Sequence, residues 1–267
     1  MIKFDPHKVA EIIRHTAFHD IMPLFRKLEK SQITNKQSGE IVTEADVRAE
    51  KRLTDELLLL LPGSLTIGEE AVKAEPKIEE RLFGDKPVWV IDPVDGTRNY
   101  ANGKKCFCVI VALCHGQQTI AGWIYDPIAE VMYFAEVGVG AWANGRSLVI
   151  PKPPARNKMT ASLGKIRRDI LKNKVSIREL PERMLRYRCI GREYIDIVLG
   201  KIHFGEYNML KPWDHAAGLL ILTESGGYHA YIDTETPYKP MPSIVKKLLV
   251  TSSESEWHRL KNCFFDV

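Results

Sequence analysis

A short apolar run, residues 88–91, ends abruptly in two carboxylates, Asp92 and Asp95. Consecutive large apolar residues indicate a strand that is buried on both faces. The proline after Asp92 fixes the backbone φ angle, and Gly96 permits a backbone conformation that most residues avoid. The polar residues 97–100 can then begin a helix, whose free N–H groups favour an anion. The stretch fits either a capped strand-to-turn junction or a site for cations and phosphate together.

The length and composition indicate a globular chain with a large core. It has 267 residues, of which 45% are hydrophobic, enough for one large domain or two closely packed halves. The formal net charge of +4 is a mild excess that excludes little by itself. Residues 165–188, however, hold nine Lys or Arg against three acids. We interpret this basic segment as a solvated face, with contact to an anionic partner as the alternative.

The sequence gives no indication of secretion or of a membrane span. The first residues lack the basic and then apolar pattern of a signal peptide, and no apolar run approaches the roughly 20 residues that a span needs. Five cysteines without a C-x-x-C pair fit a reducing compartment, so we expect a cytoplasmic protein. Cys106 and Cys108 are expected on one face of a strand, as buried small hydrophobic residues.

Strands that alternate with helices predict an α/β (α+β) fold. In the first half, the patterns predict strands at 65–68, 88–91, 106–114, 119–125 and 130–135. In the second half, strands are predicted at 159–162, 184–190 and 201–207. Helices are predicted beside them at 165–173, 191–199 and 216–225. The proline-rich residues 151–154 are the most linker-like, so we place a boundary there, with halves at 1–150 and 151–267.

Cap residues mark where the helices begin. Asp5, followed by a proline, is expected as the N-cap of the first helix. Thr43 with Asp46 three residues later resembles a capping box for the second helix, which alone would explain this acid. The last helix begins in the same way at Ser253. The glycine-containing residues 36–40 predict a hairpin tip.

Acids recur at the ends of the predicted elements. Glu69 and Glu70 follow one strand, Asp92 and Asp95 follow the next, and Asp214 lies in the first turn of a nearly all-apolar helix. Each acid has a structural explanation when it is taken alone, as a loop residue or as a partner of a helix dipole. Together, they indicate a metal site. Because the set is all carboxylate, without paired His or Cys, it favours Mg²⁺ or Mn²⁺ over zinc.

Three motifs carry a resemblance to a known family. They are Gly68–Glu70, the pattern W-x-I-D-P-x-D-G-T-x-N-[FY] from Trp89 to Tyr100, and W-D-H-A-A-G from Trp213 to Gly218. In these motifs, in this order, the chain resembles the inositol monophosphatase family. The match extends from Lys36 to residues 223–227, nearly the whole chain. The resemblance implies alternating layers of helices and sheets, a sugar-phosphatase-type sandwich that is usually assembled as a homodimer.

The resemblance also implies a Mg²⁺-dependent phosphatase that hydrolyses small phosphate monoesters. Two or three Mg²⁺ ions, or Mn²⁺ in their place, would be held by Glu69, Asp92, the backbone carbonyl of Val94, Asp95 and Asp214. One ion would lower the pKa of the attacking water, and another would neutralise charge on the leaving oxygen.

Further polar groups receive roles from the same resemblance. Thr97, with Asp46 behind it, would orient the attacking water and help to deprotonate it. The backbone N–H groups of Gly96 and Thr97 would hold the phosphate. Glu70 would support the metal ligands from behind, and Lys36 would contribute weakly to the electrostatics.

The chain departs from the family in two places where relatives contact the alcohol part of the ester. Tyr207 stands where many members have a glutamate, and Arg192 and Glu193 follow Gly191 in place of small residues. We therefore expect Arg192 and Tyr207 at the substrate, with Arg192 contacting a second anionic group. A 3'(2'),5'-bisphosphate nucleotide or fructose 1,6-bisphosphate is the alternative to an inositol 1-phosphate-like substrate.

A function of another class also has to be considered, a non-catalytic module that binds RNA or protein through its basic face. The intact set of acids with Thr97 favours the enzyme, because a binding module has no use for that set. We therefore expect a small phosphorylated substrate and a second copy of the chain as partners. Neither nucleic acid nor a membrane is expected.

Overall fold

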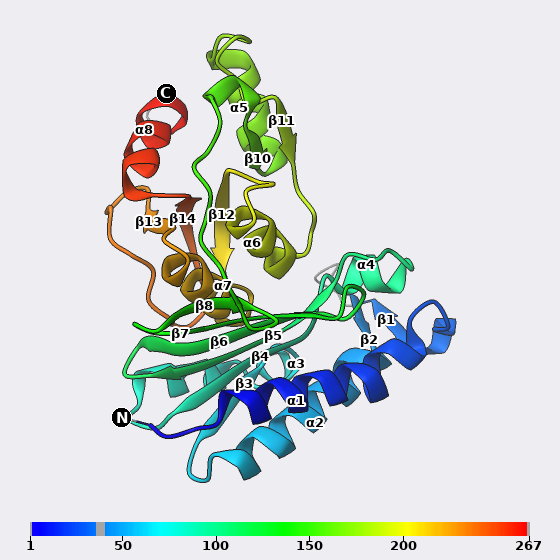
Figure 1. The fold of residues 1–267 in the computed structure, drawn as a ribbon. Coiled ribbons are helices and arrows are strands. Elements are labelled where there is room, and N and C mark those ends of the chain that lie inside the picture. Colours follow the sequence, from blue (N-terminus) through cyan, green and yellow to red (C-terminus); the bar gives the residue numbers. More distant parts are fainter. Residues whose placement is uncertain (1, 36–40, 266–267) are drawn as a thin grey trace.

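Helices and sheets alternate in five layers in the computed structural model, which describes residues 2–35 and 41–265 (Figure 1). One outer layer holds α1 (Pro6–Thr16) and α2 (Glu44–Leu60). A seven-stranded sheet separates these helices from α6 (Ile190–Val198) and α7 (Pro212–Glu224). A five-stranded sheet follows, and α5 (Lys165–Lys174) and α8 (Glu254–Phe264) cover its far face. The predicted α/β sandwich is confirmed.

The larger sheet has the strand order β3-β4-β5-β6-β7-β8-β9. β3 runs parallel to β4, and each later pair is antiparallel. The strands are β3 (Leu65–Gly68), β4 (Val88–Asp95), β5 (Cys108–His115), β6 (Gln118–Asp126), β7 (Val131–Glu136), β8 (Gly140–Ala143) and β9 (Arg146–Ser147).

The smaller sheet has the order β11-β10-β12-β14-β13. β10 is parallel to both of its neighbours, whereas β14 is antiparallel to β12 and β13. The strands are β10 (Thr160–Ser162), β11 (Arg183–Leu185), β12 (Phe204–Leu210), β13 (Tyr228–Tyr231) and β14 (Ile244–Thr251). The two sheets thus fall on opposite sides of residue 150, and the division into two domains stays a prediction.

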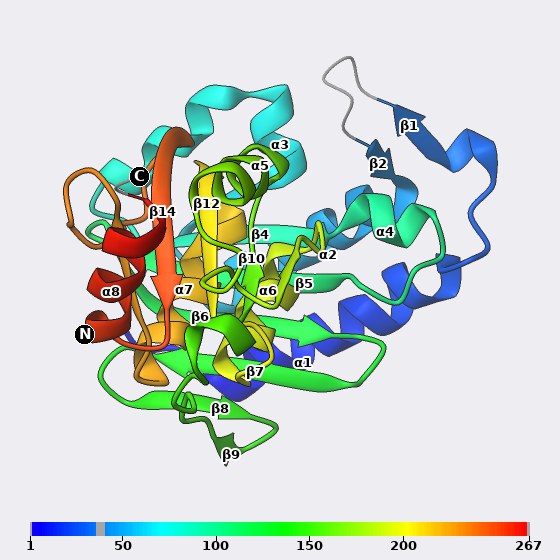
Figure 2. The same ribbon diagram turned by 90° about the horizontal axis from the view of Figure 1, so that it is seen from above.

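Short elements complete the chain. The antiparallel pair β1 (Ile33–Asn35) and β2 (Ile41–Thr43) lies beside α4 (Thr97–Ala101), as Figure 2 shows. α3 (Glu69–Ala74) follows β3 directly. The remaining turns of helix are at Ala17–Ile21 (π) and, as 3₁₀ helices, at Met22–Leu24, Lys30–Gln32, Pro76–Phe83 and Arg156–Lys158.

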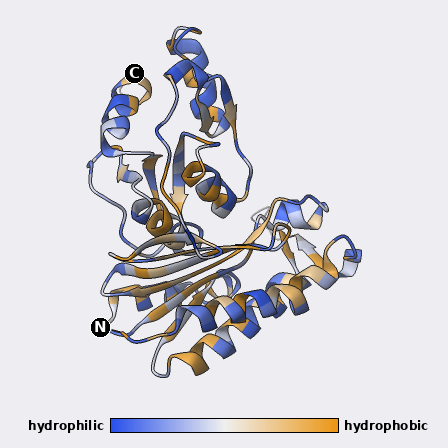
Figure 3. Cartoon of the chain, in the orientation of Figure 1, coloured by the Kyte–Doolittle hydropathy of each residue, from blue (hydrophilic) through white to orange (hydrophobic). Residues whose placement is uncertain are grey.

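The core explains why β4 is apolar at every position before its acids. Trp89 and Ile91 pack toward α1 and α2, whereas Val88 and Val90 pack toward α6 and α7. Side chains alternate between the two faces of a strand, so a strand between two helical layers must be apolar on both. Figure 3 accordingly shows hydrophobic colour along much of the larger sheet and in α7. In the described residues, no helix is long and apolar enough to cross a bilayer.

The predicted caps are confirmed, and some predicted elements end elsewhere. The side chain of Asp5 accepts hydrogen bonds from the N–H groups of residues 7 and 8, and Ser253 caps α8. The strand predicted at 184–190 is wrong beyond Leu185, because the N–H of Tyr187 is bonded by a side chain and Ile190 already begins α6. The prediction missed β8, β9, β13 and β14. The predicted hairpin tip at 36–40 lies outside the described residues.

Candidate active site

The acidic turn begins within β4 rather than after it. Asp92 pairs with Ile110 and Asp95 with Cys108 on β5, and the register shifts between these pairs as in a β-bulge. Gly96 follows with a φ of 87° and is the N-cap of α4. A Cβ atom there would lie 2.9 Å from the carbonyl oxygen of Cys106. Both the backbone angle and the close approach therefore require glycine at this turn.

Three carboxylates meet at the end of β4. Oxygen atoms of Asp92, Asp95 and Asp214 all lie within 4.8 Å of one another, with Asp214 supplied by the first turn of α7. Burial raises the pKa of each, and the charges of Glu69 and Asp95 raise the pKa of Asp92 and Asp214 further. Buried negative charges at this separation repel one another. The cluster therefore favours a bound cation.

Asp95 also anchors the start of α6. Its Oδ1 accepts a hydrogen bond of 3.1 Å from the N–H of Ile190, and its Oδ2 accepts one of 2.6 Å from the N–H of Gly191. A Cβ atom at Gly191 would meet the sulfur of Cys108 at 2.6 Å. The glycine that precedes Arg192 therefore lets the helix end approach the acid.

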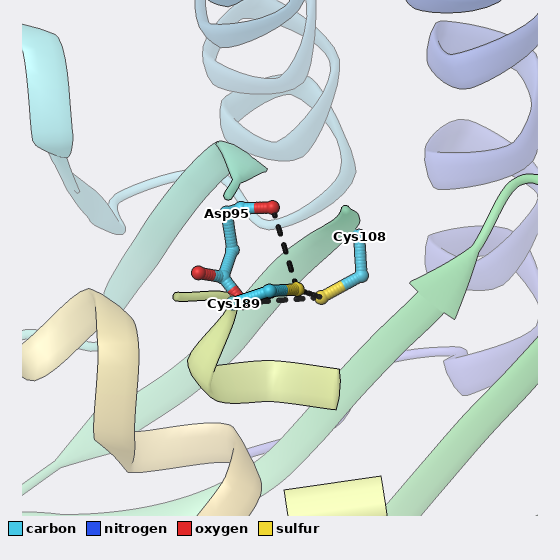
Figure 4. Close-up of side chains that lie close together, drawn as sticks. All are labelled: Asp95, Cys108 and Cys189. Atoms are coloured by element: carbon cyan, nitrogen blue, oxygen red, sulfur yellow. Dashed lines mark hydrogen bonds between the residues drawn. The ribbon is translucent and has the colours of Figure 1, made fainter. Parts of the chain in front are cut away.

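Two thiols contact the same carboxylate (Figure 4). The Sγ atoms of Cys108 and Cys189 donate to Oδ2 of Asp95 over 3.3 and 3.2 Å and lie 3.8 Å from each other. Burial raises the pKa of Cys108 to about 12 and that of Cys189 well above its usual value, which keeps both protonated. The prediction that Cys108 is buried is confirmed. Its contact with Asp95 was not predicted. Cys106 lies outside β5 and is half-buried.

Asp46 closes the predicted capping box and also contacts Thr97, while its part in catalysis stays a prediction. Its Oδ2 accepts hydrogen bonds from the N–H and the hydroxyl of Thr43, at 2.8 and 2.6 Å, which completes the capping box. Its Oδ1 lies 3.2 Å from the hydroxyl of Thr97, which is also 3.0 Å from the Val94 carbonyl oxygen. Burial, the largest cause, raises the pKa of Asp46 to about 7.

Glu69 and Glu70 begin α3 instead of lying in a loop. Lys73 bonds to both carboxylates at 2.8 Å. The negative charge of Glu69 acts on Asp92 and Asp214, so Glu69 faces the cluster from a third element.

Sequence reasoning missed Glu50, which supports this helix. It lies one turn after Asp46 on α2, is only 8% exposed, and accepts 2.8 Å hydrogen bonds from the N–H groups of Glu70 and Ala71. A Cβ atom at Gly68 would lie 2.3 Å from its carboxyl carbon. The signals available were the i,i+4 spacing from Asp46 and the glycine before the paired glutamates.

The residues predicted at the substrate are bonded within the protein. Arg192 forms ion pairs with Asp126 and, at 3.4 Å, with Asp196. Tyr207 is buried and stacks on Tyr194 with ring centroids 5.3 Å apart. Their predicted contacts with a substrate stay predictions. Lys36 lies outside the described residues.

Comparison with known proteins agrees with this geometry. The model of the inositol monophosphatase family matches residues 5–262. The chain belongs to the inositol monophosphatase family. A fructose-1,6-bisphosphatase/inositol-1-monophosphatase of Aquifex aeolicus is 32% identical, with 84% of this chain and 85% of the relative covered. Inositol monophosphatase 2 of Solanum lycopersicum is 30% identical, with 82% of each chain covered.

Solved structures of the family share the fold. The IMPase of Thermotoga maritima has a TM-score of 0.79 at 21% identity, with 97% of each chain covered. IMPase-II of Staphylococcus aureus, solved with inositol monophosphate and also with 2'AMP, has a TM-score of 0.77 at 21% identity, with 97% of this chain and 93% of that chain covered. These relatives are phosphatases of phosphate monoesters, and the inositol monophosphatase family is metal-dependent.

Proposed function

We propose that this chain is a phosphoric monoester hydrolase that uses Mg²⁺ to hydrolyse a small phosphate monoester. The observation that carries the proposal is the cluster of Asp92, Asp95 and Asp214, whose oxygens lie within 4.8 Å of one another, with the first two buried and Asp214 half-buried. Such a set is unfavourable until a cation compensates it. The cluster lies at the end of β4, beside Thr97 and Asp46. A cation bound there would supply the positive charge that attack on a phosphate needs.

The donor set fits Mg²⁺. Carboxylate oxygens from three elements, with the Val94 carbonyl beside them, are the hard ligands that Mg²⁺ prefers, and waters and substrate phosphate complete its shell. We expect Glu69, Asp92, Val94, Asp95 and Asp214 to hold two or three ions. Bound Mg²⁺ would lower the pKa of the attacking water and neutralise charge on the leaving oxygen.

The protein supplies orientation and a proton acceptor. The hydroxyl of Thr97 can donate to Asp46 while its oxygen accepts a hydrogen bond from the attacking water. Because the pKa of Asp46 is raised to about 7, this carboxylate can take up a proton near neutral pH. The backbone N–H groups of Gly96 and Thr97, at the start of α4, would hold the phosphate oxygens.

The alcohol part of the substrate decides between two activities. Relatives that act on inositol monophosphates favour an inositol phosphate-like substrate. The relative named as both a fructose-1,6-bisphosphatase and an inositol-1-monophosphatase favours activity on a bisphosphate as the second candidate. The homodimer and the cytoplasmic location stay predictions.

A panel assay tests the proposal. Phosphate release is measured from inositol monophosphates, sugar monophosphates and bisphosphates, 2'AMP and a 3'(2'),5'-bisphosphate nucleotide, with Mg²⁺, with Mn²⁺ and with a chelator. We expect metal-dependent turnover of at least one small ester. No metal-dependent turnover of any member would overturn the proposal.

A measurement of RNA binding beside the same assay separates the enzyme from a binding module. Two cations of the basic segment already face buried acids, since Arg167 pairs with Glu206 and Arg186 with Glu193. This pairing reduces the positive charge available to RNA. Binding of RNA without turnover of any ester would favour the binding module.

A further inference from the structure

We propose that Asp95, Cys108 and Cys189 form a second kind of metal site, one that takes a single thiophilic divalent cation such as Zn²⁺. The three residues come from β4, from the facing position on β5 and from the N-cap of α6. An ion held there would engage the carboxylate that the proposed Mg²⁺ cluster also needs. The site is therefore expected to inhibit the enzyme, and this consequence rests on the proposed function.

The distances among the three ligand atoms fit a tetrahedral site. In such a site, with Zn–S bonds of about 2.3 Å, two sulfurs lie about 3.8 Å apart, and a sulfur and an oxygen about 3.5 Å. The Sγ atoms of Cys108 and Cys189 are 3.8 Å apart, and they lie 3.3 and 3.2 Å from Oδ2 of Asp95 (Figure 4). Small movements would thus place all three atoms at bonding distance from one ion.

The present hydrogen bonds mark where the ion would sit. Both Sγ atoms lie within hydrogen-bonding distance of one carboxylate oxygen, Oδ2 of Asp95. Binding of the cation replaces the two thiol protons, which leave to solvent as both sulfurs become thiolates. The bond from the N–H of Gly191 to Oδ2 can remain, because a carboxylate oxygen accepts in more than one direction. It would hold the carboxylate as an outer partner holds a metal ligand.

The two sites differ in the ions that they select. Thiolate is a soft ligand that favours Zn²⁺, whereas the neighbouring carboxylates favour Mg²⁺. Asp95 belongs to both groups of ligand atoms within 4.8 Å. Zn²⁺ would therefore bind on the thiol side and draw this carboxylate away from Asp92 and Asp214.

Direct metal binding tests the site without any use of activity. The reduced full-length chain, in buffer that contains Mg²⁺, is titrated with Co²⁺, and the thiolate-to-cobalt charge-transfer absorption is recorded. Zn²⁺ then displaces Co²⁺ in competition with a chromophoric chelator. We expect one ion per chain, and X-ray absorption of the zinc-loaded wild type should give two sulfurs at about 2.3 Å. Coordination by oxygen and nitrogen alone would overturn the proposal, and this measurement needs no variant to fold.

Matched serine variants locate the ligands. Cys108→Ser and Cys189→Ser should weaken Zn²⁺ binding by at least the roughly 10- to 100-fold that loss of an outer-shell partner costs. Cys114→Ser is the control, because Cys114 is equally buried on the same strand but contacts Thr119. Circular dichroism verifies the fold of each variant. Unchanged affinity in both cysteine variants, or equal loss in the control, would contradict the site.

Inhibition is measured separately. Zn²⁺ should inhibit phosphate release from the wild type and from Cys114→Ser at similar concentrations, and should need a higher concentration in Cys108→Ser, each relative to its own uninhibited rate. A thiolate site that forms without inhibition would overturn the competition for Asp95. If no ester is turned over, the proposed function fails, while the cobalt absorption still decides whether the site exists.

Discussion

Two groups of buried acids lie on either side of α6, and their partners differ. In the described part of the chain, the hydrogen bonds recorded to Asp92 and Asp95 come from backbone N–H groups and thiols, all of them neutral. On the side of the smaller sheet, each acid faces an arginine. Arg167 bonds to both oxygens of Glu206, and Arg186 bonds to Glu193 at 3.1 Å.

This difference separates a functional group of acids from a structural one. A buried acid that is paired with a guanidinium needs no further compensation, and removing either partner leaves the other uncompensated. In the part of the chain that the structure describes, no arginine bonds to Asp92 or Asp95, which supports the proposal that a cation from solution compensates them. This difference in pairing supports the proposed metal site at the end of β4 without the use of any motif.

The largest expected effect is that of Asp95→Asn. The amide keeps the size of the side chain but removes the negative charge that is proposed to hold the metal, and that metal would neutralise the charge that develops on the leaving oxygen. Several kcal/mol of charge stabilisation would be lost, so kcat/KM should fall by roughly 1000-fold. Phosphate release is measured beside circular dichroism, with Asp55→Asn on the exposed face of α2 as the control. A near-native rate would mean that the metal assignment is wrong.

On the opposite side, the expected effect is on stability. Arg167→Met leaves Glu206, which is 2% exposed, without its partner and should lower the free energy of unfolding by about 3–5 kcal/mol. The double variant Arg167→Met with Glu206→Leu should recover most of this loss. Urea unfolding measures both variants. If the single variant were as stable as the wild type, the pairing would not distinguish the two groups of acids.

Without bound metal, the free energy of unfolding should depend on pH through the buried acids near the end of β4. Burial, as the first cause, raises the pKa of Glu50 from 4.5 to about 7. Between these values the folded state holds a proton that the unfolded state has lost, so stability falls as pH rises, by up to about 3 kcal/mol for this group. Asp46, with a pKa raised to about 7, acts in the same direction.

Urea unfolding in a chelator, at about pH 5 and about pH 8, measures this slope. Glu50→Gln should flatten it, because the amide does not titrate. Added Mg²⁺ should stabilise the wild type more at the higher pH, where the carboxylates are ionised. Equal slopes in the wild type and in Glu50→Gln would exclude Glu50 as their source.

A smaller effect is expected at the hydroxyl beside the cluster. Thr97→Val keeps the shape of the side chain but removes the group that links Asp46 to the attacking water, and kcat should fall by roughly 100-fold. Thr97→Ser keeps the hydroxyl and should keep most of the rate. Steady-state kinetics with saturating Mg²⁺ compares the two. Equal rates in the valine and serine variants would remove Thr97 from the mechanism.

What the sequence predicted of the site was mostly local. The capping box of Thr43 and Asp46 lies within four residues, and the acids follow apolar runs that the period of a strand reveals. The resemblance added order along the chain, which joined Asp46 to Thr97, 51 positions away. The layers of the fold followed from alternating elements, and the family resemblance added the sandwich.

The rest depends on contacts between distant segments. Cys189 reaches Asp95 across 94 positions, and Arg167 reaches Glu206 across 39. No periodic pattern places these residues together, because Cys189 is positioned by the packing of α6 and Arg167 by the packing of α5 on the smaller sheet. Arg192 shows the same limit, since its neighbours in sequence suggested an anionic substrate and its neighbours in space are acids of the protein.

Arg192→Ser should therefore have the smallest effect. Its guanidinium already faces Asp126 and Asp196, so a substrate phosphate has to compete with two carboxylates for it. We expect kcat/KM for monophosphates to stay within a few-fold of the wild-type value. For a bisphosphate, kcat/KM should fall by at most roughly tenfold, which corresponds to the loss of about one charged hydrogen bond. The panel of esters measures both in the wild type and in the variant. If no bisphosphate were affected, the ion pairs with Asp126 and Asp196 would be the whole role of Arg192. Arginines that face buried acids would then serve the structure on both sides of α6, as Arg167 does with Glu206.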